Sequence, residues 1–331
     1  MVVCLVAGAT GATGVHIVAE LLRMPAVEKI LLLNRRPWRE LEKSTAELWK
    51  STGKVDEKLI WDEWDLWNDA QWRSSLARSP SVVPFLHGKA GSAASTPLEP
   101  DDEDTVAALR STMTGDGVNI VFTALGTSRA NSEVKADMAA AAAETGHQGP
   151  GFERWLSEVD YRRNYLLARA ANVPPAKAPR FGPTIFSRIS AANANATADV
   201  VAEKTFSYYS RYQGLADEAV ARALSGGKMI GHILRPGALD RGDEFRAKRE
   251  WEVARNATQG PGLSVVRLAK VAVHMALSEY QKKTATLEDV KRRPSPEEQV
   301  VYVDEATIRG YDLSQITYPP IDVEHEDEED L

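Results

Sequence analysis

The chain has 331 residues, with 40 Lys and Arg against 47 Asp and Glu, which gives a formal net charge of −7. The excess acid lies in residues 322–331 (DVEHEDEEDL), which hold seven acids and no base, so residues 1–321 carry 40 acids against 40 bases. A neutral body excludes the broad basic surface that non-specific nucleic-acid binding needs. The acidic run is typical of a solvated, disordered tail.

Apolar residues make up 43% of the chain and charged residues 26%, which is ordinary globular composition. The single cysteine, Cys4, excludes a disulfide framework and fits a reducing compartment. No apolar run reaches the roughly 18 residues that a membrane span needs. A strand-like run begins at residue 2 and leaves no room for a targeting peptide, so we expect a cytoplasmic protein without a transmembrane segment.

Short apolar runs alternate with helical patterns along the chain, which favours parallel strands joined by helices. Strands are predicted at 2–7, 29–34, 59–62, 118–124, 184–189, 229–234 and 300–303. Helices are predicted at about 13–23, 39–50, 152–172, 199–225 and 264–279. The order predicts an α/β fold with a Rossmann-type, doubly wound parallel sheet.

Three segments interrupt this alternation. Residues 78–117 hold Pro, Gly and Ser clusters with an acidic stretch, residues 127–151 hold a run of alanines and then HQGPG, and residues 173–183 are rich in proline. We interpret all three as surface insertions of one domain, because such composition between regular elements is typical of loops.

Glycines follow the first predicted strand, in the sequence GATGATG at 8–14. In a dinucleotide-binding turn, Gly8 would permit the tight bend, Gly11 the approach of the pyrophosphate, and Gly14 the close packing of helix on strand. The phosphates would bind the free N–H groups at the start of the helix. The residues expected at this cofactor site are Gly8, Thr10, Gly11, Ala12, Thr13 and Gly14.

The end of the second strand indicates which cofactor binds. NAD-specific sites usually place an acid about 20 residues beyond the glycines, where it binds the ribose 2′-hydroxyl. Here Asn34 is followed by Arg35 and Arg36, and the first acid is Glu40. A guanidinium can bind a 2′-phosphate that a carboxylate would repel, so NADP(H) is favoured over NAD(H). The alternative is that the two arginines belong to a solvated loop.

Several segments together resemble the atypical short-chain dehydrogenase/reductases, and among them the Tat-interacting-protein oxidoreductase-like group and its fungal relatives on the mitochondrial outer membrane. The matching segments are VAGATGATG (6–14), LLLNRRPW (31–38), VFTALGTSRA (121–130), VDYRRNYLLARAA (159–171), ILRPGALDRGD (233–243) and KVAVHMAL (270–277). The resemblance implies a Rossmann domain over 1–235 and a small C-terminal substrate lobe with a returning strand over 236–310. The insertions and an acidic tail over 311–331 fall outside the resemblance.

The same resemblance assigns further cofactor contacts. Asp65 falls where the family often contacts adenine, with Asp62 as a competitor for that role. The loop after the fourth strand would lie along the ribose and nicotinamide, and the RPG segment would lie where cofactor and substrate meet. The residues concerned are Ala124, Leu125, Gly126, Arg235 and Pro236.

The family's catalytic pair is Tyr-x-x-x-Lys, and this chain departs from it. In the family, the tyrosine transfers the proton while the lysine binds the nicotinamide ribose and favours the phenolate. Here the matching helix places Tyr209 at the tyrosine and Gln213 at the lysine. No tyrosine in the chain has a lysine four residues later. Glutamine can bond the ribose, but it supplies no charge, and neither Arg211 nor Lys204 has the spacing to replace it.

The family's serine position is also altered. Paired serines follow the fifth strand in the family, whereas this chain has Ser190 followed by Ala191. If the second serine is the one that polarises the substrate, that function is lost unless Asn193 takes it over. Asn is also common in turns, so a purely structural role for Asn193 stands beside this one.

Two functions remain open from the sequence. The first is an NADPH-dependent reductase of a small carbonyl compound, with Tyr209 as the acid and Gln213 as a ribose contact. The second is a catalytically impaired NADP(H)-binding sensor or protein-interaction module, since the family includes members with protein partners. By the same resemblance, a peripheral position on the mitochondrial surface stands beside the cytoplasmic assignment.

Other chemistries find no support in the sequence. The six histidines lack metal-ligand spacing, so no metal site is predicted. No GxSxG elbow and no phosphate-binding P-loop motif is present, which argues against hydrolase and nucleotide-hydrolysing functions. Six of the eight tryptophans lie between residues 38 and 72. We favour helix packing over a partner-binding face as the reason for this crowding.

Overall fold

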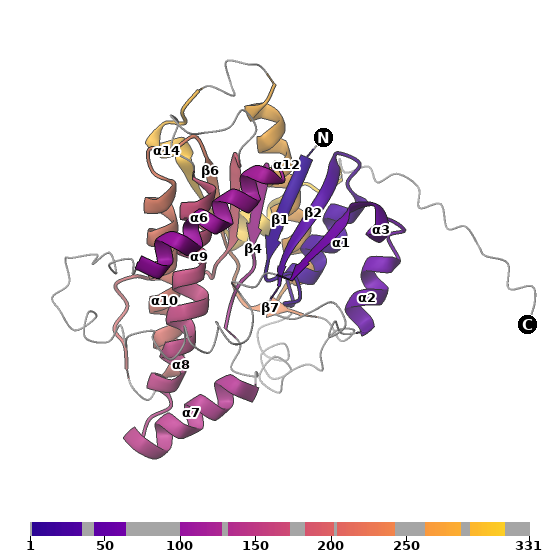
Figure 1. Cartoon of the computed structure of the whole chain (residues 1–331). Coiled ribbons are helices and arrows are strands. Elements are labelled where there is room, and N and C mark those ends of the chain that lie inside the picture. The colour runs from indigo at the N-terminus through magenta and orange to yellow at the C-terminus, as the bar shows by residue number, and fades with distance from the viewer. Residues whose placement is uncertain are drawn as a thin grey trace, which may run out of the picture.

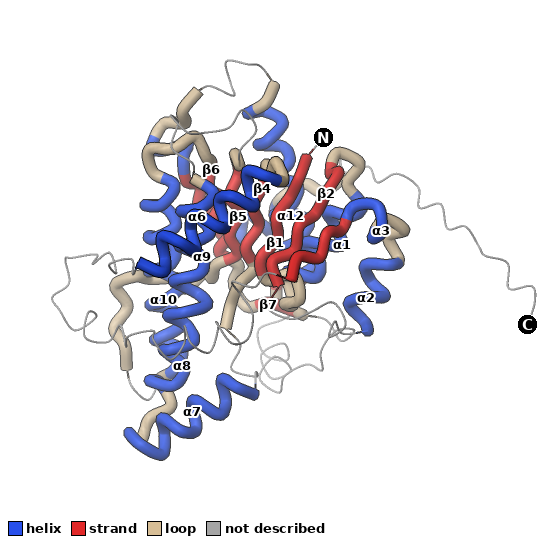
Figure 2. The backbone as a smooth tube through the Cα atoms, viewed as in Figure 1, coloured by secondary structure: helices blue, strands red, loops and turns tan. Residues whose placement is uncertain are grey.

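The computed structural model describes residues 2–34, 43–63, 100–127, 132–172, 183–201, 204–241, 262–285 and 292–314. Within these ranges one parallel sheet lies between two layers of helices (Figures 1 and 2). The α/β, Rossmann-type prediction is therefore confirmed.

Seven strands form the sheet in the order β3-β2-β1-β4-β5-β6-β9. They are β1 (Val2–Ala7), β2 (Val27–Asn34), β3 (Leu59–Glu63), β4 (Ile120–Thr123), β5 (Ile185–Ile189), β6 (Ile230–Arg235) and β9 (Val300–Asp304). Every neighbouring pair is parallel. Successive strands are added outward from β1 to β3 on one side and from β4 to β9 on the other. The strand order therefore reverses between β1 and β4, which is the point where doubly wound folds bind their ligands. All seven predicted strands are present within a few residues of their expected bounds.

The strands form because their side chains are buried on both faces, as parallel sheets require. Along β1, Cys4 and Val6 belong to one hydrophobic cluster, whereas Leu5 and Ala7 belong to the other. The first cluster packs under α1 (Gly14–Arg23) and α12 (Val265–Lys283), with Trp49 of α2 (Lys43–Lys50) at its edge. A four-residue helix, α3 (Val55–Lys58), leads from α2 into β3.

The second face is covered by three helices that lie across the sheet in Figure 1. They are α6 (Pro100–Gly115), α9 (Arg163–Ala171) and α10 (Thr205–Leu224). Residues 100–115 belong to the segment 78–117, which was predicted to be a surface insertion. Instead they form the crossover helix between β3 and β4, with Val106, Leu109 and Met113 buried against the sheet. This helix was not predicted because its buried apolar stripe consists of three residues, which gives the sequence little helical periodicity.

Residues 132–155 form two further helices in the segment expected to be the second insertion. These are α7 (Ser132–Thr145) and α8 (Gly149–Trp155), which pack on each other through Val134, Met138 and Phe152. A π-helical segment, η3 (Leu156–Arg162), joins α8 to α9. The helix predicted at 152–172 is therefore one continuous run with a wide turn inside it.

The C-terminal part of the chain is built onto the same sheet. α12 packs against α1, and β9 pairs with β6, as expected for the returning strand. A two-stranded pair, β7 (Leu239–Asp240) with β8 (Leu263–Ser264), precedes α12, and the short α14 (Pro296–Gln299) precedes β9. α15 (Glu305–Gly310) follows β9 and buries Ile308. In the part of the chain that the structure describes, no helix combines the length and the apolarity needed to cross a membrane.

Candidate functional site

The glycine turn between β1 and α1 has the shape expected of a phosphate-binding turn. Gly8 has a φ of +81°, and a Cβ there would lie 2.8 Å from the Ala124 carbonyl group. A Cβ on Gly14 would lie 2.0 Å from the Gly8 oxygen. Both positions therefore need glycine, the first for its backbone angle and the second for the contact between helix and turn. At Gly11 the nearest atom would be the Gly8 oxygen at 3.2 Å, so this residue lies in a more open part of the turn.

The start of α1 has no side-chain cap, although the Val15 and His16 amides donate to the Gly11 and Thr13 oxygens. Thr13 is the N-cap residue, yet its side chain makes no capping bond, and the first turn holds no acid. The residues around it are partly open, and Thr10 is exposed. The positive end of a helix dipole suits an anion, and a pyrophosphate contact with Thr10, Ala12 and Thr13 stays a prediction.

The loop after β4 lies next to this turn. The Ala124 amide donates to the Ala7 oxygen at 2.9 Å, which holds the end of β4 against the end of β1. Leu125 is half-buried and Gly126 is exposed. The Thr127 amide donates to Asp160 Oδ2 at 2.9 Å, so this loop is tied to η3 below it.

Tyr209 and Gln213 occupy consecutive turns of α10, as their spacing predicted. Gly214 follows them, and a Cβ there would lie 2.0 Å from the Ala196 amide nitrogen. No larger residue would fit at position 214, so the glycine allows the loop between β5 and α10 to lie directly against the helix. Tyr209 is half-buried, and its ring lies 6.4 Å from the exposed ring of Phe206, measured between centroids.

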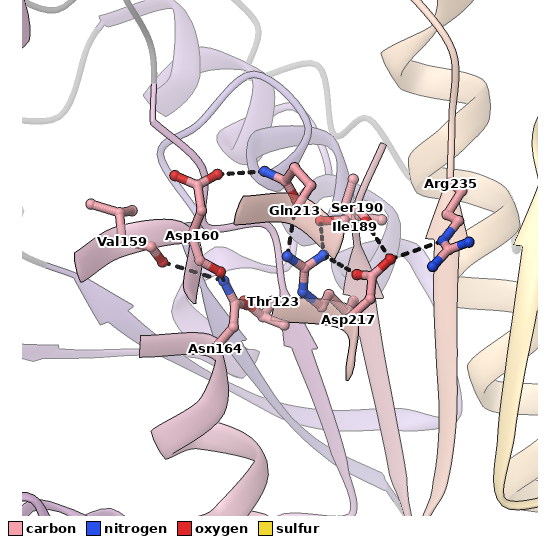
Figure 3. Close-up of polar contacts among 10 residues, drawn as sticks. Thr123, Val159, Asp160, Asn164, Ile189, Ser190, Gln213, Asp217 and Arg235 are labelled. Atoms are coloured by element: carbon pink, nitrogen blue, oxygen red, sulfur yellow. Dashed lines mark hydrogen bonds and ion pairs between the residues drawn. The ribbon is translucent and has the colours of Figure 1, made fainter. Parts of the chain in front are cut away.

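Gln213 is the centre of a buried polar chain that Figure 3 shows in full. Its Nε2 donates to Asp160 Oδ1 at 2.5 Å, and its Oε1 accepts from Arg188 Nη2 at 2.9 Å. Arg188 Nη1 lies 2.9 Å from Asp217 Oδ1. Both members of that ion pair are fully buried. The lysine position is thus occupied by an amide that links a carboxylate to a guanidinium.

Asp160 reaches this chain because of the wide π-helical turn. Asn164 donates to the main-chain oxygens of Val159 and Asp160 at 3.3 and 2.8 Å, and accepts from Thr123 Oγ1 at 2.6 Å. The amide thereby satisfies carbonyls that the π-helix leaves out of an α-helical pattern, a feature frequent at functional sites. Burial raises the pKa of Asp160 to about 6, against the opposing effects of its bonds to Thr127 and of the Arg188 charge.

The Tyr209 hydroxyl is a weak acid in this setting. Burial and then the charge of Asp160 raise its pKa to about 12, against the opposing charges of Arg188 and Arg241. A lysine would lower this pKa, but Gln213 carries no charge. Lys204 is exposed at the start of α10, and Arg211 donates to the Ala198 oxygen at 3.1 Å. Arg188 of β5 and Arg241 are therefore the cations that act on this tyrosine, and neither was among the predicted site residues.

Ser190 and Asn193 follow β5 and differ in what they offer a substrate. Ser190 is buried and donates its hydrogen to Asp217 Oδ2 at 2.9 Å, which leaves only its lone pairs for other contacts. The Asn193 main-chain oxygen accepts from the Ser210 hydroxyl. The Nδ2 of Asn193 is buried and has no hydrogen-bond partner among the described residues. Of the two, Asn193 has the free donor.

The remaining predicted cofactor residues are in different positions. Arg235 Nε donates to Asp217 Oδ2 at 2.8 Å, and its guanidinium lies 4.4 Å from the centre of the Tyr302 ring. The Pro236 oxygen accepts from the Ala192 amide at 2.8 Å. Asn34 ends β2. Arg35, Arg36 and Asp65 lie outside the described residues.

The site contains three charged residues that the sequence analysis did not select, Asp160, Arg188 and Asp217. Two of them left a signal. A buried strand containing an arginine needs a partner for its charge. Asp217 lies four residues after Gln213 and eight after Tyr209, on the same face of α10. Asp160 is 53 residues from Gln213, and nothing in the local pattern indicates their contact. In the described ranges no cluster of His, Cys, Asp or Glu is placed to hold a metal ion.

Neither a protein-family model nor a curated relative matches the sequence. Solved structures match at low identity over most of their length. A 3-oxoacyl-(acyl-carrier-protein) reductase from Agrobacterium tumefaciens, solved with NADP bound, is 13% identical over 92% of this chain and 93% of its own, with a TM-score of 0.51. A 3-oxoacyl-[acyl-carrier protein] reductase from Brucella melitensis, in complex with NAD, is 13% identical over 94% and 98%, with a TM-score of 0.49. At this identity the likeness shows the fold alone, and the chain has the Rossmann-type fold of the short-chain dehydrogenase/reductases.

Proposed function

We propose that the protein binds NADP(H) and reduces a carbonyl compound, with Tyr209 as the proton donor. The observation that carries this proposal is the position of the glycine turn beside the loop after β4. The Gly8 α-carbon faces the Ala124 backbone, and Thr127 of the same loop is bonded to Asp160, which contacts Gln213. A cofactor lying on the turn would extend along this loop toward α10. The glycine turn and Gln213, which are expected to contact opposite ends of the cofactor, are thus linked through the contacts of the loop after β4 and of Asp160.

The cofactor preference is argued from charge. Asn34, Arg35 and Arg36 present no carboxylate at the end of β2, and two guanidiniums can bind a 2′-phosphate. The turn and the uncapped start of α1 would hold the pyrophosphate. When bound, the reduced nicotinamide supplies a hydride to the substrate carbon.

The protein's own residues would supply the proton and hold the oxygen. Because its pKa is raised to about 12, Tyr209 stays protonated at neutral pH and can give its proton to a carbonyl oxygen. The phenolate that would accept a proton from an alcohol is almost absent, so reduction is favoured over oxidation. The unpartnered Nδ2 of Asn193 is the donor available to bind the same oxygen. Ser190 contributes indirectly, since its hydrogen is committed to Asp217.

A second function is favoured by the same pKa. A phenol this weak, beside an amide instead of a lysine, is a poor acid, and general acid catalysis by a positioned group is worth about 10²- to 10⁴-fold. The site would then bind NADP(H) without efficient turnover and respond to the redox state of the cofactor. The two functions share the cofactor and differ in whether Tyr209 transfers a proton.

Calorimetric titration with NADPH and NADH tests the shared part. We expect NADPH to bind more tightly than NADH to the wild-type protein, and the difference to shrink about tenfold or more in the double variant Arg35→Ala/Arg36→Ala. Lys43→Ala removes an exposed cation on the neighbouring α2 and should leave both affinities unchanged. No binding of either cofactor, or tighter binding of NADH, would contradict the proposal.

Turnover separates the two functions. A panel of aldehydes and ketones is mixed with NADPH, and cofactor oxidation is followed with the wild-type protein and with Tyr209→Phe. For the reductase, we expect wild-type turnover and a loss of at least about 100-fold in Tyr209→Phe, with NADPH affinity retained. Tight binding without turnover by either protein would favour the sensor. Equal turnover by both proteins would show that Tyr209 is not the acid.

A further inference from the structure

Arg188 is an arginine inside a buried strand, where long charged side chains are rare. It lies in β5 between Ser187 and Ile189, and its side chain is fully buried. Its guanidinium faces α10, where it contacts Gln213 and Asp217. A charge placed so deep is strongly destabilising unless it is paired and hydrogen-bonded.

The Arg188 guanidinium contacts Asp217 and Gln213, whereas its buried Nε has no hydrogen-bond partner among the described residues. Asp217 already accepts hydrogen bonds from Arg235 and Ser190, so the carboxylate has partners without Arg188. The second arm of the guanidinium reaches the Oε1 of Gln213 at 2.9 Å. This contact fixes the orientation of the amide, because an oxygen that accepts from Arg188 leaves the nitrogen facing Asp160.

We propose that Arg188 is a positioning residue that replaces the charge of the missing lysine, acting on Tyr209 and Asp160 through the Gln213 amide. The positive charge that the family places on the helix at position 213 is thus supplied by a residue of β5. Glutamine at position 213 follows from this arrangement. It has an acceptor for the guanidinium and a donor for the carboxylate, whereas a lysine has only donors.

The consequence of removing Arg188 follows from the same contacts. Without the guanidinium, the Gln213 amide loses its fixed orientation, and the positive charge that acts on both Tyr209 and Asp160 is lost. Arg241 also acts on Tyr209, and Asp217 acts on it with the opposite sign. Among the groups that act on Asp160, Arg188 is the charge that lowers its pKa.

The first test reads the charge directly and requires no catalysis. The titration of the Asp160 carboxyl is followed by carbon-13 NMR in the full-length protein, with its signal assigned by its loss in Asp160→Asn. We expect the midpoint to rise by about one pH unit or more in Arg188→Met. Asp217→Asn is the matched control, since it removes a buried charge of the same ion pair that does not contact Asp160. Its midpoint should stay at or below that of the wild type.

If Arg188→Met does not fold, the double variant Arg188→Met/Asp217→Asn removes the ion pair as a unit, and its midpoint is compared with that of Asp217→Asn alone. The same rise is expected. An unchanged Asp160 midpoint in a folded variant lacking Arg188 would overturn the proposal. So would an equal rise in Asp217→Asn, because that would reflect general loosening of the core.

The second test rests on the proposed reductase function. We expect Arg188→Met to lower kcat about tenfold or more without changing the KM for NADPH, and Arg188→Met/Gln213→Lys to recover most of that loss. Recovery by a lysine at position 213 would not follow from a merely structural role of Arg188. A folded Arg188→Met protein with wild-type kcat would overturn the proposal. If the wild-type protein turns over no substrate, the reductase function fails while the NMR result still decides the role of Arg188.

Discussion

Asp160 is a buried carboxyl group with both of its oxygens engaged. It is fully buried, and both of its carboxylate oxygens accept hydrogen bonds, from Gln213 and from Thr127. The bonds and the Arg188 charge favour its ionised form, whereas burial favours the neutral form and has the larger effect. The raised pKa, about 6, means that this carboxyl changes charge close to physiological pH.

The pKa of Asp160 makes stability depend on pH in a defined direction. Because the folded value of about 6 lies above the ordinary 3.8, the unfolded chain releases this proton first as pH rises. The stabilising contribution is fully present below pH 3.8 and is lost as pH rises through 6, a difference of roughly 3 kcal/mol at most. We expect the free energy of unfolding of the wild type, minus that of Asp160→Asn, to fall by this order between pH 4 and 7.5.

Urea unfolding at a series of pH values measures this difference, and the groups common to both proteins cancel in it. The charged groups that act on Tyr209 beside Asp160 are Arg188, Arg241 and Asp217, and Tyr209 itself stays protonated across this range. A difference that is flat, or that rises with pH, would show that Asp160 is not the buried acid described above.

At the scale of secondary-structure elements, glycines allow the glycine turn and α10 to pack closely against neighbouring backbone. The turn holds α1 against β1 through the contact of Gly14 with Gly8, while Gly214 lets the loop after β5 approach α10. Two secondary-structure boundaries are thus fixed by glycines, and both border the proposed cofactor path. In both elements, residues of the proposed site lie next to the glycine that makes the close backbone contact possible.

Gly14→Ala tests the first of these boundaries. The added Cβ would lie 2.0 Å from the Gly8 oxygen, so α1 or the turn must move. We expect a loss of about 1–3 kcal/mol in the free energy of unfolding, as for other overpacked contacts, and a loss of NADPH binding of at least tenfold. Gly115→Ala is the control, because a Cβ there meets no atom within 4 Å. Denaturation and calorimetry of both variants give the result, and unchanged NADPH affinity in a folded Gly14→Ala protein would contradict the role of the turn.

The strands and the glycine turn could be predicted from sequence because each depends on local pattern. Buried parallel strands are continuous apolar runs, and α10 displays Tyr209 and Gln213 at a helical spacing. The α6 helix was missed because glycine, proline and acidic residues precede a narrow apolar stripe. The contact between Asp160 and Gln213 was out of reach, since it depends on a π-helical turn that brings distant segments together. Local pattern therefore identified the helix that bears the site, and tertiary packing determined its charges.

For the whole molecule, the C-terminal region completes the sheet that carries the site. β9 covers the edge of β6, and Val303 and Ile308 are buried with Leu268 of α12. Tyr302 of the same strand lies under the Arg235 guanidinium, which contacts Asp217. The last strand is thus connected to the polar chain through one arginine, whereas the acidic residues 322–331 follow well beyond it in the sequence.

Two truncations separate these contributions. Ending the chain after Ile321 removes seven acids and brings the formal charge from −7 to zero, and we expect unchanged thermal stability and NADPH affinity. Ending it after Ala285 also removes β9 and α15, which exposes the edge of β6 and loses two buried side chains worth about 1.5–3 kcal/mol each. We expect that shorter protein to aggregate or to melt at a much lower temperature.

Thermal denaturation and NADPH titration of both proteins decide the matter, because a stable, NADPH-binding protein ending at Ala285 would show that the sheet does not need its last strand. Weaker binding in the protein ending at Ile321 would place the acidic residues in contact with the cofactor site, contrary to the division of the chain into a neutral, cofactor-binding body and an acidic end.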